Sequence, residues 1–275
     1  LSSIFRQAEE SLIIVNAHRI NSGEYPYVNE KEKDFFFMER TDEQSIVALI
    51  SELATTRLSA YYDGIEPIKD IQILTPVRKG TLGTASLNTE LQRMLNPPDV
   101  MKTEKKLGDR LFREGDKVMQ TRNNYQIGWK KRRDFSEGQG VFNGDIGYIH
   151  SIDNDAGQMT VIFDEDRFVS YEFGQLDEIE LAYAMTVHKS QGSEFPIVVM
   201  PVSWFPPMLA TRNLLYTAVT RGKKVVILCG MQRRMEAMVD NNRIKLRFSG
   251  LKHRLRALIG RSIIGSNEET LGNEV

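Results

Sequence analysis

The side chains best suited to chemistry gather in two stretches of the C-terminal third. Residues 186–195 read T-V-H-K-S-Q-G-S-E-F, and residues 215–222 read L-Y-T-A-V-T-R-G. Hydroxyl groups and turn amides donate hydrogen bonds to phosphate oxygens. A planar, permanently charged guanidinium can contact two phosphoryl oxygens at once. The two stretches therefore predict the handling of a phosphate-bearing ligand.

The elements around these stretches would place them at the edges of one sheet. We expect Thr186 to cap a short helix that Gly192 ends, and Thr211 to cap a second helix that Gly222 ends. An apolar run that predicts a buried strand follows each helix, at 196–201 and at 223–230. Strands that alternate with polar loops and helices are typical of a parallel α/β sheet.

A phosphate-cradling P-loop, G-x-x-x-x-G-K-[ST], does not occur in the sequence. The glycines and lysines of 79–84 and 221–223 lack its spacing. The acidic run 164–166 lies between two alternating apolar segments, which favours a turn over a metal-binding acid pair. We therefore expect this chain to contribute to a nucleotide site that another segment completes. Leu1 also reads as lying inside an ongoing segment, which indicates the C-terminal half of a longer protein.

The composition is that of a globular protein, with 41% hydrophobic and 27% charged residues. No apolar run approaches the ~20 residues of a membrane span, so no membrane partner is expected. The single Cys229 predicts core packing in a reducing, cytoplasmic compartment, and four scattered His give no metal site. The net charge is −1, yet nine Lys/Arg occur in 231–261 and four in 130–133. These basic runs could meet nucleic-acid phosphate or form solvated helix faces.

The character of the chain changes near residue 115. Before it, the pattern predicts strands at 35–39 and 70–76 and helices that close at 11–16 and span 84–95. It also predicts a helix that begins with a capping box of Thr41 and Gln44 and runs to about Leu58. From about 115 to 177 the predicted strands are short and bounded by turns, at 117–121, 147–152, 159–163 and 168–173. They predict a small antiparallel β-barrel inserted into the α/β domain. We divide the chain into 1–121 and 179–275, which form one α/β domain with basic C-terminal helices, and the barrel at 122–178.

The two opening stretches, in this order, resemble motifs V and VI of superfamily 1 helicases and are most similar to those of RecD/TraA-type DNA helicases. Shorter similarities lie at 5–7, 16–21, 73–76 and 141–147, so the resemblance covers nearly the whole chain. It implies a RecA-like second motor domain that lacks its own P-loop. It also implies that the inserted barrel is Src-homology-3-like and lies beside the DNA path.

The resemblance implies roles for five residues around the nucleotide. Arg6 and Arg221 would be arginine fingers that stabilise the charge on the γ-phosphoryl group during hydrolysis. Gln191, Gly192 and Glu194 would contact the nucleotide, with Glu194 bonding the ribose hydroxyls. The simpler alternatives are that Arg221 is a cation at a helix C-terminus and that 191–194 is an ordinary loop.

Another set of residues is implied for the DNA backbone. Thr186, His188 and Lys189 come from motif V, and the loop after the strand at 70–76 would add Thr75, Pro76 and Lys79. The alternative for the latter three is a plain strand-to-loop turn. In the barrel, Tyr125 and Trp129 could stack on bases or belong to a core or an interface.

The resulting interpretation is the C-terminal motor half of an ATP-dependent 5′-to-3′ DNA helicase of repair or recombination, inactive alone. ATP with Mg²⁺ would be bound mainly by the missing N-terminal half. The expected partners are single-stranded DNA, the N-terminal motor domain of the same chain and other repair or recombination subunits. A non-catalytic nucleic-acid-binding or protein-interaction module and the helicase part of a conjugative relaxase stay open as alternatives.

Overall fold

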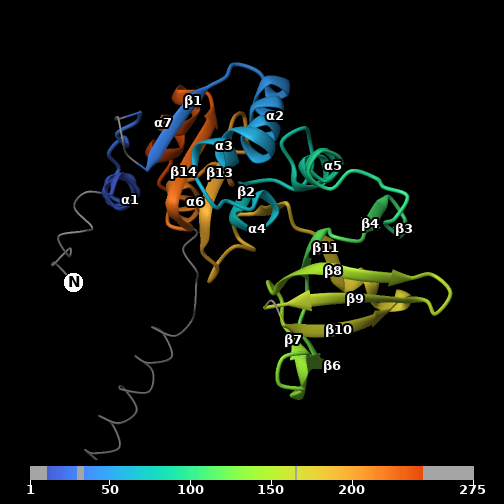
Figure 1. Ribbon diagram of the computed structural model, residues 1–275. Helices are drawn as coiled ribbons and strands as arrows, with labels where there is room; N and C mark the ends of the chain where they lie inside the picture. Colours follow the sequence, from blue (N-terminus) through green and yellow to red (C-terminus); the bar gives the residue numbers. More distant parts are fainter. Residues whose placement is uncertain (1–10, 30–33, 165, 244–275) are drawn as a thin grey trace, which may run out of the picture. The chain divides into compact units, whose positions relative to one another are not determined.

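The computed structural model describes residues 11–29, 34–164 and 166–243 (Figure 1). These residues form a five-stranded parallel sheet with helices, a seven-stranded antiparallel sheet and a two-stranded hairpin. The predicted α/β fold with an antiparallel insertion is confirmed. Arg6 and most of the basic segment 231–261 lie outside the described residues.

The parallel sheet has the strand order β1-β14-β13-β2-β12. Every pairing in it is parallel, and its central strands are buried almost throughout because helices cover both faces. The strands predicted at 35–39, 70–76, 196–201 and 223–230 are all present. Their bounds are β1 Phe35–Glu39, β2 Ile71–Thr75, β13 Phe195–Val202 and β14 Gly222–Gly230. The fifth strand, β12 Ala184–Thr186, was not predicted.

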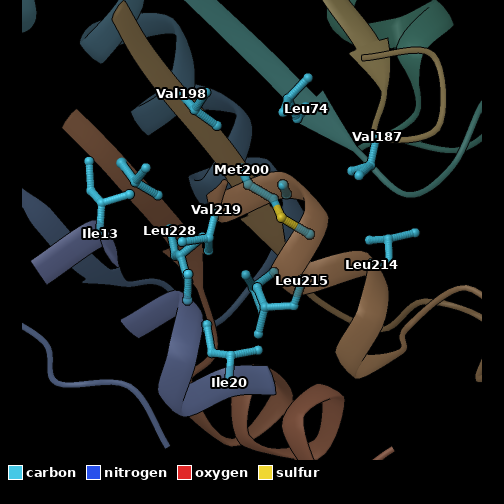
Figure 2. Close-up of a cluster of buried hydrophobic side chains, with 14 of the residues drawn as sticks. Ile13, Ile20, Leu74, Val187, Val198, Met200, Leu214, Leu215, Val219 and Leu228 are labelled. Carbon is cyan, nitrogen blue, oxygen red and sulfur yellow. The ribbon is translucent and has the colours of Figure 1, made fainter. Parts of the chain in front are cut away.

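Two hydrophobic cores lie against the two faces of this sheet, because successive side chains of a strand point to opposite faces. In β13, Val198 and Met200 belong to the first core, where Figure 2 shows Ile20 of α1 and Leu215 of α6. Ile197 and Val199 belong to the second core, with α2 and α5. The helices are α1 Leu12–Ser22, α2 Glu43–Glu52, α3 Leu58–Tyr61, α4 Pro67–Asp70, α5 Thr84–Leu95, α6 Arg212–Val219 and α7 Gln232–Asp240, with a π-helical segment Leu53–Arg57 between α2 and α3.

Two predicted helix ends are wrong in the first part of the chain. The apolar segment at 11–16 begins helix α1 instead of closing one, and Gly23 ends that helix in a left-handed conformation (φ 88°). Asp42, and not Thr41, caps α2, because its carboxylate accepts a hydrogen bond from the Ser45 amide at 2.8 Å. Asp is among the strongest N-cap residues, so it displaces the Thr one position earlier.

Motifs V and VI differ from each other in how well the sequence predicted their local structure. Thr211 does cap α6, since its hydroxyl accepts from the Leu214 amide at 3.3 Å. Gly222 begins β14, however, and does not end the helix. Thr186 ends β12, and residues 187–192 form a series of turns in place of the predicted short helix. The Thr186 carbonyl accepts the amides of Lys189 and Ser190, so it starts these turns through its backbone.

The antiparallel sheet, called the barrel below, has the order β11-β5-β8-β9-β10-β6-β7. Its strands are β5 Lys117–Gln120, β6 Asn124–Lys131, β7 Glu137–Val141, β8 Ile146–Asp153, β9 Gln158–Phe163, β10 Arg167–Glu172 and β11 Ile179–Leu181. The sequence did not predict β6 and β7, which are rich in Gly and charge. Asp164 and Asp166 lie in the turn between β9 and β10, as expected. The hairpin β3 Glu104–Leu107 and β4 Arg110–Arg113 precedes β5.

The boundaries 122 and 178 remain a division made from the sequence. The barrel sheet extends beyond both of them, because β5 ends at Gln120 and β11 begins at Ile179. These two strands pair with each other and run directly into the α/β domain. The barrel is therefore joined to the α/β domain through two adjacent antiparallel strands.

A buried polar cluster lies where the barrel strands meet the α/β domain. The Asp116 carboxylate is fully buried and accepts hydrogen bonds from Gln92 at 2.6 Å, Asn96 at 2.7 Å and the Tyr183 hydroxyl at 2.8 Å. It also accepts the Arg113 amide at 2.7 Å. Burial raises the pKa of the Asp116 carboxyl, and these donors oppose that rise. Helix α5 is thereby tied to the first barrel strand.

Lys117, the next residue, is buried, and within the described residues no carboxylate lies at hydrogen-bonding distance from its ammonium group. Its ammonium group donates to the backbone carbonyls of Lys69 at 3.3 Å and Ile71 at 3.4 Å. Burial lowers the pKa of Lys117 to about 7, because the charged form loses its hydration. A titrating amine thus lies between β5 and the start of β2.

Candidate nucleic-acid and nucleotide-phosphate site

The motif V loop, residues 187–194, runs from the side of the parallel sheet where the strands end to the side where they begin. These two sides are called the carboxyl edge and the amino edge. Thr186 pairs with Thr75 at the carboxyl end of β2. Phe195 lies two residues before Ile197, which pairs with Ile71 at the amino end of β2. Six residues of strand rise separate the two levels, which is about 20 Å. The first half of the loop therefore belongs to the carboxyl edge of the sheet and its last residues to the amino edge.

A groove of about 750 Å³ lies at the carboxyl edge. Crevices at the carboxyl ends of parallel strands are the usual ligand sites of open α/β sheets. Five of the six residues predicted to bind DNA line the groove, namely Pro76, Lys79, Thr186, His188 and Lys189. The structure therefore brings together residues that are more than one hundred positions apart in the sequence.

Thr75 is the sixth predicted residue, and its side chain does not line the groove. It is fully buried, and its hydroxyl donates to the Leu82 carbonyl at 2.6 Å. Gly83 closes the same loop tightly, because a Cβ there would lie 2.6 Å from the Lys79 carbonyl carbon. Thr75 thus fixes the shape of the loop 76–83, which leaves Arg78 and Lys79 exposed.

The electrostatics of the groove favour an anion. Arg78 and Lys79 form no ion pair within the described part of the chain, and His188 is exposed. Lys189 is neutralised by Glu180, whose carboxylate lies 2.9 Å from its ammonium group. Glu43 is the acidic residue among the groove's lining side chains. Helix α5, which follows the loop, carries no acidic residue in its first turn, where a negative charge would compete with a bound phosphate.

The other lining residues were not predicted from the sequence, and they include one cation and two aromatic residues, Arg78, Trp204 and Phe205. Trp204 is exposed over 65% of its surface, and the guanidinium of Arg234 lies over its ring. A signal was available, because the aromatic pair comes one residue after β13, whose carboxyl end must share an edge with that of β2. Arg78 is adjacent to the predicted Lys79 and lies in the same exposed loop.

The residues predicted to contact the nucleotide lie at the opposite, amino edge. The Arg221 guanidinium donates to the carbonyls of Ser193 at 3.1 Å and Thr217 at 3.3 Å and to the Thr220 hydroxyl at 3.3 Å. All three acceptors are neutral, so its charge is not compensated by them. Glu194 instead forms an ion pair with Lys223 at 3.0 Å.

Gln191 and Gly192 are exposed beside this arginine. Gly192 has a φ of 91°, which favours glycine, and a Cβ built on it would meet no atom within 4 Å. Open backbone next to an uncompensated guanidinium fits an anionic ligand such as a nucleotide phosphate. Arg6, the other predicted finger, lies outside the described residues.

Other kinds of site are less well supported. The part of the chain that the structure describes holds no group of three His, Cys, Asp or Glu that could bind a metal ion. The described helices include none that is long and apolar enough to span a membrane. Cys229 is buried in β14, where burial raises the pKa of its thiol to about 12. It is therefore a packing residue and not a reactive thiol.

Two family models match the chain in order. Residues 87–163 match the SH3 domain of ATP-dependent RecD-like DNA helicases. Residues 181–229 match the UvrD-like helicase C-terminal domain. The first match covers α5 and much of the barrel, and the second covers the strands and loops of motifs V and VI.

Two relatives of known name are also RecD proteins. The chain is 30% identical to the ATP-dependent RecD2 DNA helicase of Deinococcus radiodurans, over 94% of this chain and 32% of that protein. It is 29% identical to the RecBCD enzyme subunit RecD of Mycolicibacterium smegmatis, over 70% of this chain and 31% of that protein. The chain thus spans about a third of the length of these relatives.

A solved structure of the Pif1 helicase from Bacteroides, in complex with ADP-AlF3 and ssDNA, is 19% identical and covers 83% of this chain and 51% of its own. Its TM-score of 0.46 is too low to transfer positions between the two structures. The two domain matches and the RecD relatives carry the assignment instead. The chain is therefore a RecD-like region of the superfamily 1 helicases, with their SH3 and C-terminal helicase domains.

Proposed function

We propose that this chain is the C-terminal motor part of an ATP-dependent 5′-to-3′ DNA helicase of DNA repair or recombination. Single-stranded DNA would cross the groove at the carboxyl edge of the parallel sheet. ATP would lie at the amino edge, between this chain and an N-terminal motor domain. The single observation that carries the proposal is that one groove is lined by five of the residues for which the resemblance implies DNA contact. The direction of movement rests on the resemblance to RecD-type helicases.

The groove suits the backbone of a single strand. Thr186 and His188 line it from the motif V loop, and Lys79 lines it from the loop after β2. Contacts of this kind position a strand without reading its sequence, because every nucleotide offers the same phosphate. We therefore expect binding without sequence preference, with an affinity that falls as salt rises.

The amino edge suits the phosphates of ATP. Arg221 would leave its neutral acceptors and bind γ-phosphoryl oxygens when the two motor domains close on the nucleotide. Gly192 would let the backbone approach the nucleotide, and Glu194 would exchange Lys223 for the ribose hydroxyls. Mg²⁺ would neutralise phosphate charge from the partner domain, which would also carry the P-loop. The chain alone is not expected to hydrolyse ATP.

The motif V loop would couple the two sites. One continuous segment carries Thr186 and His188 at the carboxyl edge and Gly192 and Glu194 at the amino edge. A shift that nucleotide binding imposes on one end is transmitted through the turns that Thr186 starts. Movement along DNA would thereby follow the state of the nucleotide.

The test is a salt titration of DNA binding by a groove variant and by a control variant that loses a positive charge outside the groove. In the protein that contains this chain, the pair Arg78→Ala and Lys79→Ala should weaken binding to oligo-dT. It should also reduce the slope of log K against log salt by about 1.4, at about 0.7 per phosphate contact on a single strand. Lys106→Ala, which removes an exposed lysine of β3 outside the groove, should change neither quantity. An unchanged slope in the groove variant would contradict the proposed DNA path.

A further inference from the structure

Trp204 is one of several large apolar side chains that are exposed, and it also lines the groove. It lines the groove together with Lys79 and His188, yet 65% of its surface is exposed. Burying an indole ring is strongly favourable, so a ring left open in a groove is available for a ligand. Pro206 and Pro207 follow shortly after Trp204. The Asn241 side-chain amide holds this segment, because it donates to the carbonyls of Pro207 at 2.8 Å and Ala210 at 2.7 Å. The segment carrying Trp204 is therefore fixed on its C-terminal side.

The ring also has a cation over it. Arg234 of α7 places its guanidinium over the Trp204 ring, in a cation–π contact. No ion pair of Arg234 occurs within the described residues, and its Nε atom is buried without a hydrogen-bond partner. The neighbouring Arg233 adds a second positive charge. The ring is thus held beside a guanidinium whose charge no carboxylate balances.

We propose that Trp204 stacks on a base of the single strand in the groove, with Arg234 holding the ring in place. This inference rests on the proposed function and adds a base contact to its phosphate contacts. A nucleotide fits the combination, because it joins a flat apolar ring to an anion. Arg78 and Lys79, exposed in the same groove, would bind the phosphates that flank the stacked base. An acidic peptide would satisfy the cations but would offer a ring to Trp204 only where it carried an aromatic residue, whereas every nucleotide carries a base.

Stacking makes a specific demand on the DNA. Base–aromatic stacking tolerates any base but requires one, so a single abasic position should weaken binding when it lies opposite Trp204. Removing the ring by Trp204→Ala should reduce affinity for oligo-dT by roughly 5- to 150-fold. Trp204→Phe should retain most of the affinity, because the phenyl ring can still stack. The matched control is Tyr61→Ala, which removes an aromatic side chain that is 78% exposed outside the groove.

The experiment combines affinity and cross-linking in the protein that contains this chain. A set of dT oligonucleotides, each just long enough to fill the site in one register and each with one abasic site at a different position, is titrated against wild type, Trp204→Ala, Trp204→Phe and Tyr61→Ala. We expect one position to be sensitive in wild type, Trp204→Phe and Tyr61→Ala, and none in Trp204→Ala. An oligonucleotide with 5-iododeoxyuridine at that position should cross-link on irradiation to the peptide that contains Trp204.

The outcomes separate this inference from the function on which it rests. An abasic penalty that persists in Trp204→Ala, or a cross-link to another aromatic residue such as Trp129, would overturn the stacking role. If affinity depends on Arg78 and Lys79 but not on Trp204, the groove binds DNA by its backbone alone. If wild type binds no single-stranded DNA, the proposed function itself fails.

Discussion

Arg221 shows how the setting of one residue bears on its proposed role. Its guanidinium lies near the amino edge of the sheet, bonded to two carbonyls and a hydroxyl, none of which carries charge. Such bonds orient a guanidinium without neutralising it. The simpler alternative, a cation stabilising the C-terminus of α6, also fits its position two residues beyond the last helical residue.

Kinetics distinguishes these two roles. Arg221→Ala in the complete helicase should lower kcat for ATP by about 10³- to 10⁵-fold and change nucleotide affinity little, because a finger acts on charge that develops in the transition state. The measurement is steady-state ATPase with a saturating single strand, together with nucleotide binding. Lys224→Ala, an exposed cation of β14, is the control and should leave kcat unchanged. A folded Arg221→Ala protein with near-normal kcat would leave Arg221 as a helix-end cation.

Lys117 gives a prediction about pH. Its folded-state pKa is about 7, against an ordinary value of 10.5, so between these values the unfolded chain binds one proton more than the folded one. The Lys117 contribution to the free energy of unfolding should therefore rise by about 1.4 kcal/mol per pH unit from about pH 7 towards pH 10, and be flat below pH 7. Lys117→Met should lack this slope. Urea denaturation of both proteins at several pH values gives the difference, and parallel curves would contradict it.

The sequence predicted those parts of the candidate site in which polar or charged residues directly follow a recognisable buried strand. Pro76 and Lys79 were found in this way, because the loop after a buried strand must lie at its carboxyl edge. Trp204 was missed because an aromatic residue after a strand can belong to a core as well as to a groove, although its place after β13 puts it at the carboxyl edge of the sheet. That the Thr75 hydroxyl turns inward was also not predictable, because its acceptor is a backbone carbonyl seven residues away.

At the scale of elements, apolar periodicity carried most of the prediction. Helix α5 has the predicted bounds of 84–95, with Leu87 and Leu91 buried, although Met94 is 40% exposed. The turns at 187–192 were mistaken for a helix because capping hydroxyls and a closing glycine mark both structures. Strands β6 and β7 carry too much glycine and charge for alternation to reveal them. Their place is set by pairing within the barrel, which no local pattern encodes.

The Asp116 cluster should be the stability element that joins α5 to the barrel. Asp116→Asn places an amide where four donors converge, so at least one buried donor loses its acceptor. We expect the free energy of unfolding to fall by about 2 to 4 kcal/mol, in the range for an unsatisfied buried polar group next to a lost charge-assisted bond. The exposed Asp155→Asn should cost about 0.5 kcal/mol or less. Chemical denaturation measures both, and equal effects would show that the cluster contributes little.

At the scale of the molecule, the barrel can be removed at a place where its two connections meet. Arg122 and Asp177 form an ion pair at 2.8 Å, so a short Gly/Ser linker can replace residues 123–176. The α/β domain should stay folded, since β5 and β11 keep their mutual pairing. DNA binding should weaken and unwinding by the complete protein should fail, because the resemblance to RecD-type helicases implies that the barrel lies beside the DNA path.

Circular dichroism, salt titrations of single-strand binding and a strand-separation assay measure these three outcomes. A loop-only control, in which 154–157 is replaced by Gly/Ser, keeps the barrel and should keep both activities. If affinity and unwinding survive the removal, the barrel is a docking module for a protein partner. A flat salt response in every variant would argue against phosphate contact altogether.

The motif V loop has a further consequence, which concerns its length. Its ends lie about 20 Å apart along the strands and two strand spacings, about 10 Å, across them, which gives a diagonal of about 22 Å. The nine steps from Thr186 to Phe195 can reach at most about 30 Å when fully extended. The turns at 187–192 already use much of that margin, since turn backbone advances less per residue. The segment therefore has little slack, and a deletion of two residues would leave seven steps, about 23 Å, which would straighten it and displace His188 and Gly192 together.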